Sequence, residues 1–195
     1  MAVILFVDIM DSSELSNVLT FEEYDAFVHG FQSVAKDVVT EHLLERQDHR
    51  KQNERCFEVS IRGDELCVIL YSDVPHAQEE EHRRLDVKTA LALAIDMKRR
   101  WLCSDQNATR IRDGKSIVDI GIGMNCGYVV VGNHWRATTD HAIRQQHTAE
   151  GYAINLAKRI EGHSRSGTYS KIFVSRSVFT ILGIDFQVAF SPVSI

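Results

Sequence analysis

Residues 56–71 read CFEVSIRGDELCVILY, two β-rich runs joined by Arg62, Gly63 and Asp64. Aromatic, β-branched and aliphatic residues on both sides are typical of strands, and glycine followed by aspartate is typical of the tight turn between them. The stretch therefore predicts a β-hairpin. Taken alone, Asp64 needs no explanation beyond that turn, and an exposed adhesion loop is disfavoured because the chain shows no secretory features.

A second aspartate changes the interpretation of Asp64. Asp8 directly follows the apolar run AVILFV, where a carboxylate is poorly placed for solvation. If the hairpin pairs with this strand, both carboxylates converge at one sheet edge, where charges about 4 Å apart repel by roughly 4 kcal/mol at an effective dielectric of about 20. A divalent cation reverses the sign of that interaction, and carboxylate oxygens suit Mg²⁺ or Mn²⁺. The pair is therefore a candidate metal site.

Length and composition fit one ordinary globular domain covering residues 1–195, with 44% hydrophobic residues, 25% charged residues and a net charge of -5. A weakly acidic chain without a long basic run indicates neither nucleic-acid nor membrane-surface binding. The N-terminal apolar run is too short for a membrane span and lacks the basic flank of a signal peptide. Since the four cysteines show no CxxC spacing, we expect reduced thiols and a cytoplasmic protein.

The order of the remaining patterns predicts an α/β sandwich. Helices are expected where apolar residues recur at helical spacing. These are the stripes at Tyr24, Phe27, Phe31, Val34 and Val38 and at Val87, Leu91, Ile95 and Leu102, followed by a third helix at 151–163. Strands are expected at 2–9, in the two hairpin arms, in two runs within 116–133, at 171–175 and at 186–190, with polar loops at 47–55 and 134–146.

Four sequence blocks follow one another along the chain: FVDIMDSS (6–13), IRGDEL (61–66), IGIGMNCGYVVVGN (120–133) and TAEGYAINLAKRIEG (148–162). Together they resemble the catalytic domain of the class III nucleotidyl cyclases, most closely the pyrimidine cyclases of bacterial Pycsar anti-phage systems. The combination is far more specific than any one block. The resemblance implies a ferredoxin-like α+β sandwich in which helices pack on a mainly antiparallel sheet.

The resemblance also implies roles for individual residues. Asp8 and Asp64 match the family's two metal-binding aspartates, and the backbone carbonyl of Ile9 matches a further ligand, so two divalent cations, Mn²⁺ or Mg²⁺, are expected. Asn155 and Arg159 match the pair that steadies the ribose and neutralises charge on the α-phosphate, and their i, i+4 spacing puts both on one helix face. Without the motif, a surface ion pair would explain Arg159 and a polar helix start would explain Asn155.

Base recognition is where the chain departs from the family. Thr148 stands where the family places an Asp or Thr that contacts the base, although a helix cap would also explain it. Ser60, four residues before Asp64, replaces the lysine of adenylate cyclases and the acid of guanylate cyclases. Two small hydroxyls can pair with a uracil or cytosine edge, which favours a pyrimidine nucleotide without distinguishing the two bases. The resemblance to the pyrimidine cyclases makes UTP the expected substrate. Phe6, at the start of the first block, is a further candidate for substrate binding.

The family often carries a basic residue near its C-terminal strand that reaches the triphosphate, and FQVAFSPVSI (186–195) has none. Either the chain is truncated at its C-terminus, or the triphosphate charge falls to another residue. The candidates are Arg62, Arg136, Arg144 or another residue that the sequence does not place.

The implied reaction converts a nucleoside triphosphate to its 3′,5′-cyclic monophosphate and pyrophosphate by two-metal catalysis, with Arg159 stabilising charge at phosphorus. In the family the metal aspartates come from one subunit and the base-reading residues and the Asn–Arg pair from the other, which implies a head-to-tail homodimer with two composite active sites. The product would act on a cyclic-nucleotide-binding effector in anti-phage defence. The alternatives are an adenylate or guanylate cyclase with an unusual base pocket and a catalytically silent regulatory module.

Overall fold

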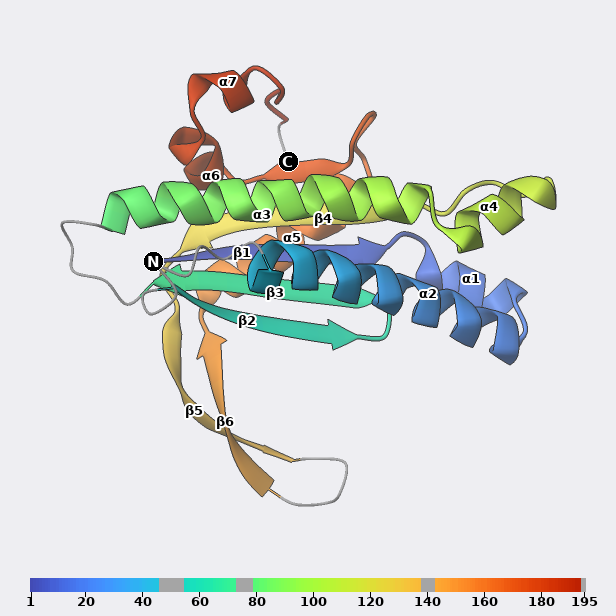
Figure 1. Cartoon of the computed structure of the whole chain (residues 1–195), viewed down its shortest axis with the longest axis horizontal. Helices are drawn as coiled ribbons and strands as arrows, with labels where there is room; N and C mark the ends of the chain where they lie inside the picture. The colour runs from blue at the N-terminus through green and yellow to red at the C-terminus, as the bar shows by residue number, and fades with distance from the viewer. Residues whose placement is uncertain (46–54, 73–78, 138–142, 194–195) are drawn as a thin grey trace.

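The computed structural model describes residues 1–45, 55–72, 79–137 and 143–193, with side chains for all of these except 45, 55, 72, 133–137 and 143–148. Its centre is a five-stranded sheet in the order β2-β3-β1-β4-β7 (Figure 1). The strands are β1 (Ala2–Ile9), β2 (Arg55–Arg62), β3 (Glu65–Ser72), β4 (Ile120–Gly127) and β7 (Ile172–Val174). Every neighbouring pair is antiparallel except β4 and β7, which confirms the mainly antiparallel sheet.

Helices cover both faces of the sheet. Helices α2 (Phe21–Val39) and α3 (Glu79–Leu102) pack on one face, and α5 (Tyr152–Ser164) packs on the other (Figure 1). The remaining elements are α1 (Ser12–Val18), the π-helix η1 (Thr40–Glu45), α4 (Asp105–Arg112), α6 (Arg176–Ile181), α7 (Ile184–Gln187) and the ribbon of β5 (Val130–Ala137) and β6 (Ile143–Glu150). The ribbon projects away from the sheet. In the described part of the chain, no helix has the length and apolar content needed to span a bilayer.

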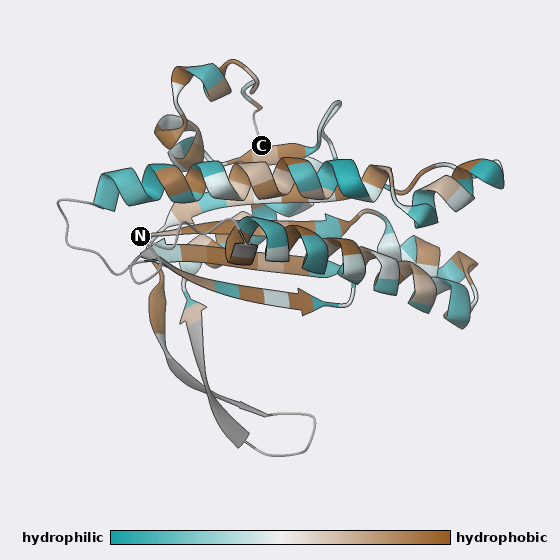
Figure 2. Ribbon diagram, in the orientation of Figure 1, coloured by the Kyte–Doolittle hydropathy of each residue, from teal (hydrophilic) through white to brown (hydrophobic). Residues whose placement is uncertain are grey.

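The central strand β1 is buried on both faces. Val3, Leu5 and Val7 belong to the core under α2 and α3, while Ile4 and Phe6 belong to the smaller core under α5. This alternation explains the near-continuous apolar run in the sequence, because side chains of a strand point to opposite faces in turn. Figure 2 shows β1 and β3 hydrophobic over most of their length.

Helix α2 shows how local chemistry and packing agree. Its start is a capping box, in which the Thr20 hydroxyl accepts from the Glu23 backbone N–H and the Glu23 carboxylate accepts from the Thr20 N–H. Phe27 and Phe31, four residues apart, both pack edge-to-face on Trp101 of α3, with ring centroids 5.2 and 5.6 Å away. The predicted aromatic stripe is therefore the α2–α3 contact.

Small residues on β4 allow α5 to lie directly against the sheet. A Cβ on Gly123 would stand 2.2 Å from the backbone N of Glu161, and one on Gly127 would stand 2.7 Å from the Cβ of Ala153. Asn125, on the same face, donates from Nδ2 to the Ala153 carbonyl at 2.9 Å. The glycine spacing of the third sequence block therefore fixes the position of the helix that carries the Asn–Arg pair.

The polar loop predicted at 134–146 is wrong at both of its ends, and its middle, 138–142, lies outside the described residues. Strands β5 and β6 extend through both of its ends and pair antiparallel from Val130↔Glu150 to Ala137↔Ile143. The residue types there do not alternate between apolar and polar, so the sequence lacks the pattern that marks a half-buried strand. Most of the predicted loop at 47–55 lies outside the described residues.

The strand predicted at 186–190 is also wrong. Residues Ile184–Gln187 form the short helix α7, and the Gln187 side chain donates to the carbonyls of Phe179 and Leu182 at 2.8 and 2.7 Å. A short apolar run does not distinguish strand from helix, and here tertiary hydrogen bonds decide the outcome. Helix α4 was not predicted either.

Gly123→Ala should lower the free energy of unfolding by roughly 1–3 kcal/mol, because neither the β4 backbone nor the α5 backbone can move aside without loss of contacts. Urea denaturation measures the change. Gly162→Ala is the matched control in α5, since no atom lies within 4 Å of its added Cβ, and it should be neutral or stabilise by up to about 1 kcal/mol. Equal effects of the two substitutions would contradict the close-packing account.

Candidate active site

The end of β1 and the β2–β3 turn lie side by side. In the antiparallel pairing of β1 with β3, Asp8 is opposite Glu65, and the backbone N–H of Ile9 donates to the Asp64 carbonyl at 3.2 Å. Gly63 has φ 59°, a left-handed conformation that glycine adopts without strain, so the turn is tight. Hairpin pairing thus brings the two aspartates to the same end of the sheet.

Burial disfavours the ionised form of the Asp8 carboxylate. Burial raises its pKa from 3.8 to about 6, and the negative charges of Glu161 and Asp64 act in the same direction, while Lys158 partly opposes them. The influence of Asp64 on Asp8 places the two carboxylates in one electrostatic environment. The ionised pair therefore needs a positive charge nearby.

Lys158 of α5 supplies that charge. Its ammonium donates to Asp8 at 2.8 Å, to Glu65 at 2.8 Å and to Glu161 at 3.0 Å. Burial alone would lower the Lys158 pKa, but these three hydrogen bonds raise it well above its ordinary value. The Lys158 nitrogen also lies over the ring of Phe6, 5.6 Å from its centroid, which is a cation–π contact. Phe6 itself is buried beneath Lys158.

Asn155 and Arg159 lie on the other side of α5. Both are exposed, whereas Ala153, Ala157 and Glu161 of the same helix are buried against the sheet. Within the described residues, neither side chain forms a hydrogen bond or ion pair with Asp8, and Arg159 has no ion-pair partner. A surface ion pair therefore does not account for Arg159 in this part of the chain.

Ser60 lies on β2 opposite Cys67 of β3 and is partly buried. Because side chains alternate along paired strands, Ser60 and Cys67 point to the same face of the sheet as Asp8. Burial is the main cause that raises the pKa of Cys67 to about 12, so this thiol is protonated at neutral pH. Ser60 and its cross-strand partner Cys67 therefore present two uncharged side chains, while the charges that act on Cys67 come from Glu65, Glu58, Arg62 and Lys158 around them.

Thr148 lies in β6, where its backbone pairs with Gly132, and its side chain is outside the described residues. Helix α5 is capped by Gly151, so the cap interpretation of Thr148 is wrong. The next residue, Ala149, donates its backbone N–H to the Glu58 carboxylate at 2.8 Å. Glu58 thereby joins β6 to the strand that also carries Ser60, a contact that no sequence pattern predicted.

The arginine candidates occupy two places. Arg62 is exposed at the end of β2 beside the hairpin turn. Arg136 and Arg144 are backbone partners across β5 and β6, and their side chains lie outside the described residues. Only Arg62 can therefore be placed close to the end of β1.

The sequence model for the "Adenylate and Guanylate cyclase catalytic domain" matches residues 1–194. The chain belongs to this family. Among solved structures, the guanylyl cyclase Cya2 is 22% identical, with 93% of this chain and 78% of that chain covered and a TM-score of 0.65. A bacterial light-regulated adenylyl cyclase is 20% identical over 91% of this chain and 76% of that chain, with a TM-score of 0.58.

A class III adenylyl cyclase-like ATP-binding protein from Pseudomonas aeruginosa is 14% identical, with 93% of this chain and 34% of that chain covered and a TM-score of 0.60. No curated protein matches the sequence. Cyclases of this family generally use divalent metal ions and are in general dimeric.

The residues of this cyclase fit a divalent cation. The carboxylates of Asp8 and Asp64 and the carbonyl of Ile9 are hard oxygen donors of the kind Mg²⁺ and Mn²⁺ prefer. The Lys158 ammonium on Asp8 is a stand-in cation, which shows that the site stabilises positive charge. No group of three or more His, Cys, Asp or Glu side chains within the described ranges is arranged to hold a metal ion by itself.

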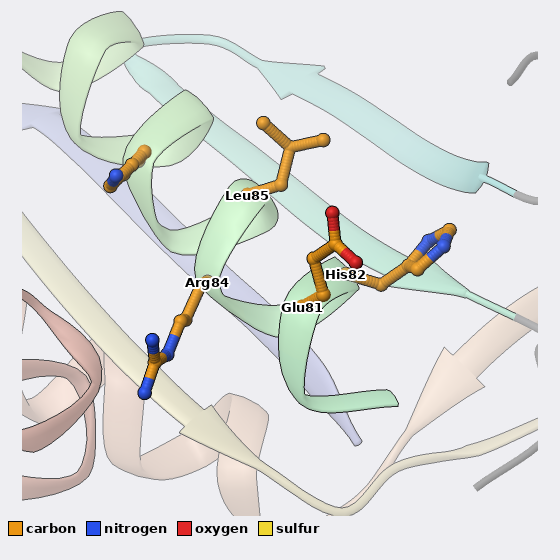
Figure 3. A pocket seen from close by; sticks show the side chains of 5 residues that line it. Glu81, His82, Arg84 and Leu85 are labelled. Atoms are coloured by element: carbon orange, nitrogen blue, oxygen red, sulfur yellow. The ribbon is translucent and has the colours of Figure 1, made fainter. Parts of the chain in front are cut away.

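A hollow of about 360 Å³ in the cyclase lies elsewhere, along the first turns of α3. It is lined by Glu81, His82, Arg84, Leu85 and Lys88. Figure 3 shows these side chains leaving a single helix in different directions, Arg84 on the side away from Leu85. Glu79, at the start of this helix, pairs with the amino group of Met1, so the hollow lies at the opposite end of β1 from Asp8 and takes no part in the site.

In the metal-free cyclase, stability should fall as pH rises from about 4 to about 6. In this window the folded chain retains a proton on Asp8 that the unfolded chain has released, so folding is favoured at the acidic end. The free energy of unfolding should therefore fall by roughly 2 kcal/mol between the two ends of the window. Urea denaturation in the presence of a chelator, with Asp8→Asn as the reference, isolates the effect. A wild-type minus variant difference that stays constant across this range would contradict the raised pKa.

Proposed function

We propose that this cyclase is a phosphorus–oxygen lyase that converts a nucleoside triphosphate to the 3′,5′-cyclic monophosphate and pyrophosphate. The observation that carries the proposal is the meeting of Asp8 and Asp64 at the end of β1, in a chain that the family matches over residues 1–194. We treat residues 1–195 as one catalytic domain. In the reaction a bond forms between the ribose 3′-oxygen and the α-phosphorus, and the bond from the α-phosphorus to the bridging oxygen of pyrophosphate breaks.

The metal-binding residues would be Asp8, Asp64 and the carbonyl of Ile9, with two cations, Mn²⁺ or Mg²⁺. When bound, such cations lower the pKa of a coordinated hydroxyl and neutralise phosphate charge. Arg62, exposed beside the turn, can donate to the terminal phosphates from its fixed fork of N–H groups. The hydroxyl proton passes to water or to a second substrate molecule, since no side chain of the site is an evident base.

Asn155 and Arg159 would orient the ribose and stabilise the charge that develops at phosphorus, an electrostatic contribution commonly worth several kcal/mol. Both side chains are exposed and make no contact with Asp8 in the described residues, so they are available to a neighbouring molecule. We therefore propose a head-to-tail homodimer with two active sites, each built from the metal aspartates of one subunit and the Asn–Arg pair of the other.

For the base, we propose a pyrimidine, with UTP as substrate. Ser60 supports this choice because its hydroxyl can both donate and accept, whereas it cannot supply the long charged contact that purine cyclases use at this position. Thr148 on β6 would contact the same base, and Glu58 connects β6 to the strand of Ser60. The resemblance further supports a cytoplasmic enzyme whose cyclic UMP activates a cyclic-nucleotide-binding effector in anti-phage defence.

Two other functions have support from the comparisons. A purine substrate is favoured by the similarity to structures described as guanylyl and adenylyl cyclases. Nucleotide binding without turnover is favoured by the similarity to an adenylyl cyclase-like ATP-binding protein. Measurement of the product separates all three.

Incubation with each of the four nucleoside triphosphates and Mn²⁺, followed by chromatography, should give cyclic UMP as the dominant product. Asp64→Asn should lower the rate by about 100-fold or more, because it removes a metal-binding charge. Cyclic AMP or cyclic GMP as the main product would overturn the pyrimidine assignment. Absence of any cyclic product, with triphosphate binding retained in calorimetry, would overturn the enzymatic function.

Shared active sites predict rescue in trans. Asp64→Ala and Arg159→Ala chains should each be inactive alone, and an equal mixture should recover roughly one quarter of wild-type activity, since half of the dimers are mixed and each has one intact site. A mixture of Asp8→Ala and Asp64→Ala chains is the matched control and should show no rescue, because both changes fall in the same half of the site. Equal behaviour of the two mixtures would contradict the composite arrangement.

A further inference from the structure

Lys158 binds the same carboxylate that the proposed function assigns to a metal ion. Its ammonium lies between Asp8 on β1, Glu65 on β3 and Glu161 on α5, each within 3.0 Å. The ammonium binds Oδ2 of Asp8. A divalent cation on the same carboxylate would be repelled by it, so the two compete. The side chain is tethered to the same chain, which keeps its effective concentration at the site high.

Glu161 provides a second place for this ammonium. The residue is only 1% exposed, and its Oε1 is buried without a hydrogen-bond partner in the described part of the chain, while Oε2 binds Lys158. Oε1 lies beside Gly121, 2.8 Å from the point where a Cβ on that residue would stand. Gly121 is opposite Asp8 in the β1–β4 pairing, so Oε1 is close to the end of β1. A buried carboxylate is costly without a counter-charge, so Glu161 keeps Lys158 close even when Asp8 is taken.

We propose that Lys158 is a built-in competitor of the divalent cation, which occupies Asp8 in the metal-free chain and withdraws to Glu65 and Glu161 when the cation binds. The inference rests on the metal-binding role of Asp8 in the proposed function. Lys158 is thus a positioning residue that keeps the carboxylates together before metal arrives and sets the metal concentration at which the site fills. In the metal-free chain one ammonium faces three carboxylates, so two negative charges are left over, and a divalent cation on Asp8 would balance them.

Removal of the ammonium should tighten metal binding. In Mn²⁺ titrations followed by electron paramagnetic resonance, Lys158→Gln and Lys158→Met should lower the apparent Kd by about tenfold or more, the usual effect of removing one charge-assisted competitor. Lys158→Arg retains the positive charge and should stay close to wild type. Unchanged Mn²⁺ affinity in the neutral variants would overturn the inference while leaving the proposed function intact.

Lys171→Gln is the matched control for loss of one positive charge near the site. Lys171 lies 3.5 Å from the Met10 sulfur and 3.6 Å from Asp119, and it makes no contact with Asp8 in the described structure. Its substitution should change the Mn²⁺ affinity by about twofold at most, because a charge that does not touch Asp8 acts only through the screened field. A tenfold gain in this control as well would show a general charge effect and overturn the competition.

A readout on the wild-type chain does not depend on folding of the neutral variants. The side-chain ammonium signal of Lys158, assigned in NMR spectra by its loss in Lys158→Arg, should shift on titration with Mg²⁺ and should stay fixed in Asp8→Asn. A signal that does not move at saturating Mg²⁺ would overturn the inference. Absence of Mn²⁺ and Mg²⁺ binding in every chain, with or without Lys158, would instead overturn the metal-binding role of Asp8 and the proposed function with it.

Discussion

Direct contact between the backbones of α5 and β4 is the constraint on which the remaining geometry depends. Gly123 and Gly127 remove the side chains that would hold the helix away, and Asn125 fixes its position along the strand. Once the helix has this depth and register, its 3.6-residue period decides which side chains meet the sheet and which face outward. Lys158 is turned inward and Arg159 outward by the same packing.

The end of β1 combines a hydrophobic core strand with a charged terminus, and this combination carries a cost. Asp8 continues a strand buried on both faces, so its carboxylate loses solvation, and two further carboxylates crowd the same ammonium. Natural sites tolerate such local strain where a ligand later relieves it, and the surrounding core must supply the stability. The apolar run before Asp8, packed between helices on both sides, is well suited to that task.

Much of this arrangement followed from the sequence. Turn chemistry at Gly63 and apolar periodicity predicted the hairpin, β1 and the three long helices, and pairing of the hairpin with β1 implied that Asp8 and Asp64 meet. The contacts of Lys158 were not predictable, because they depend on the register of three strands and on the depth of α5. The polar ribbon β5–β6 was missed because its residue types do not alternate, and the short α7 because hydrogen bonds distant in sequence determine it.

The hydrogen bond from the Ala149 backbone to the Glu58 carboxylate joins β6 to β2. Each strand keeps its register through its own ladder, β2 with β3 and β6 with β5, so this bond links two hairpins. A substitution that shifts one hairpin at this point would therefore also disturb the other. For engineering, the two hairpins are best transplanted together, since a graft of one alone would leave the Glu58 carboxylate or the Ala149 N–H without its partner.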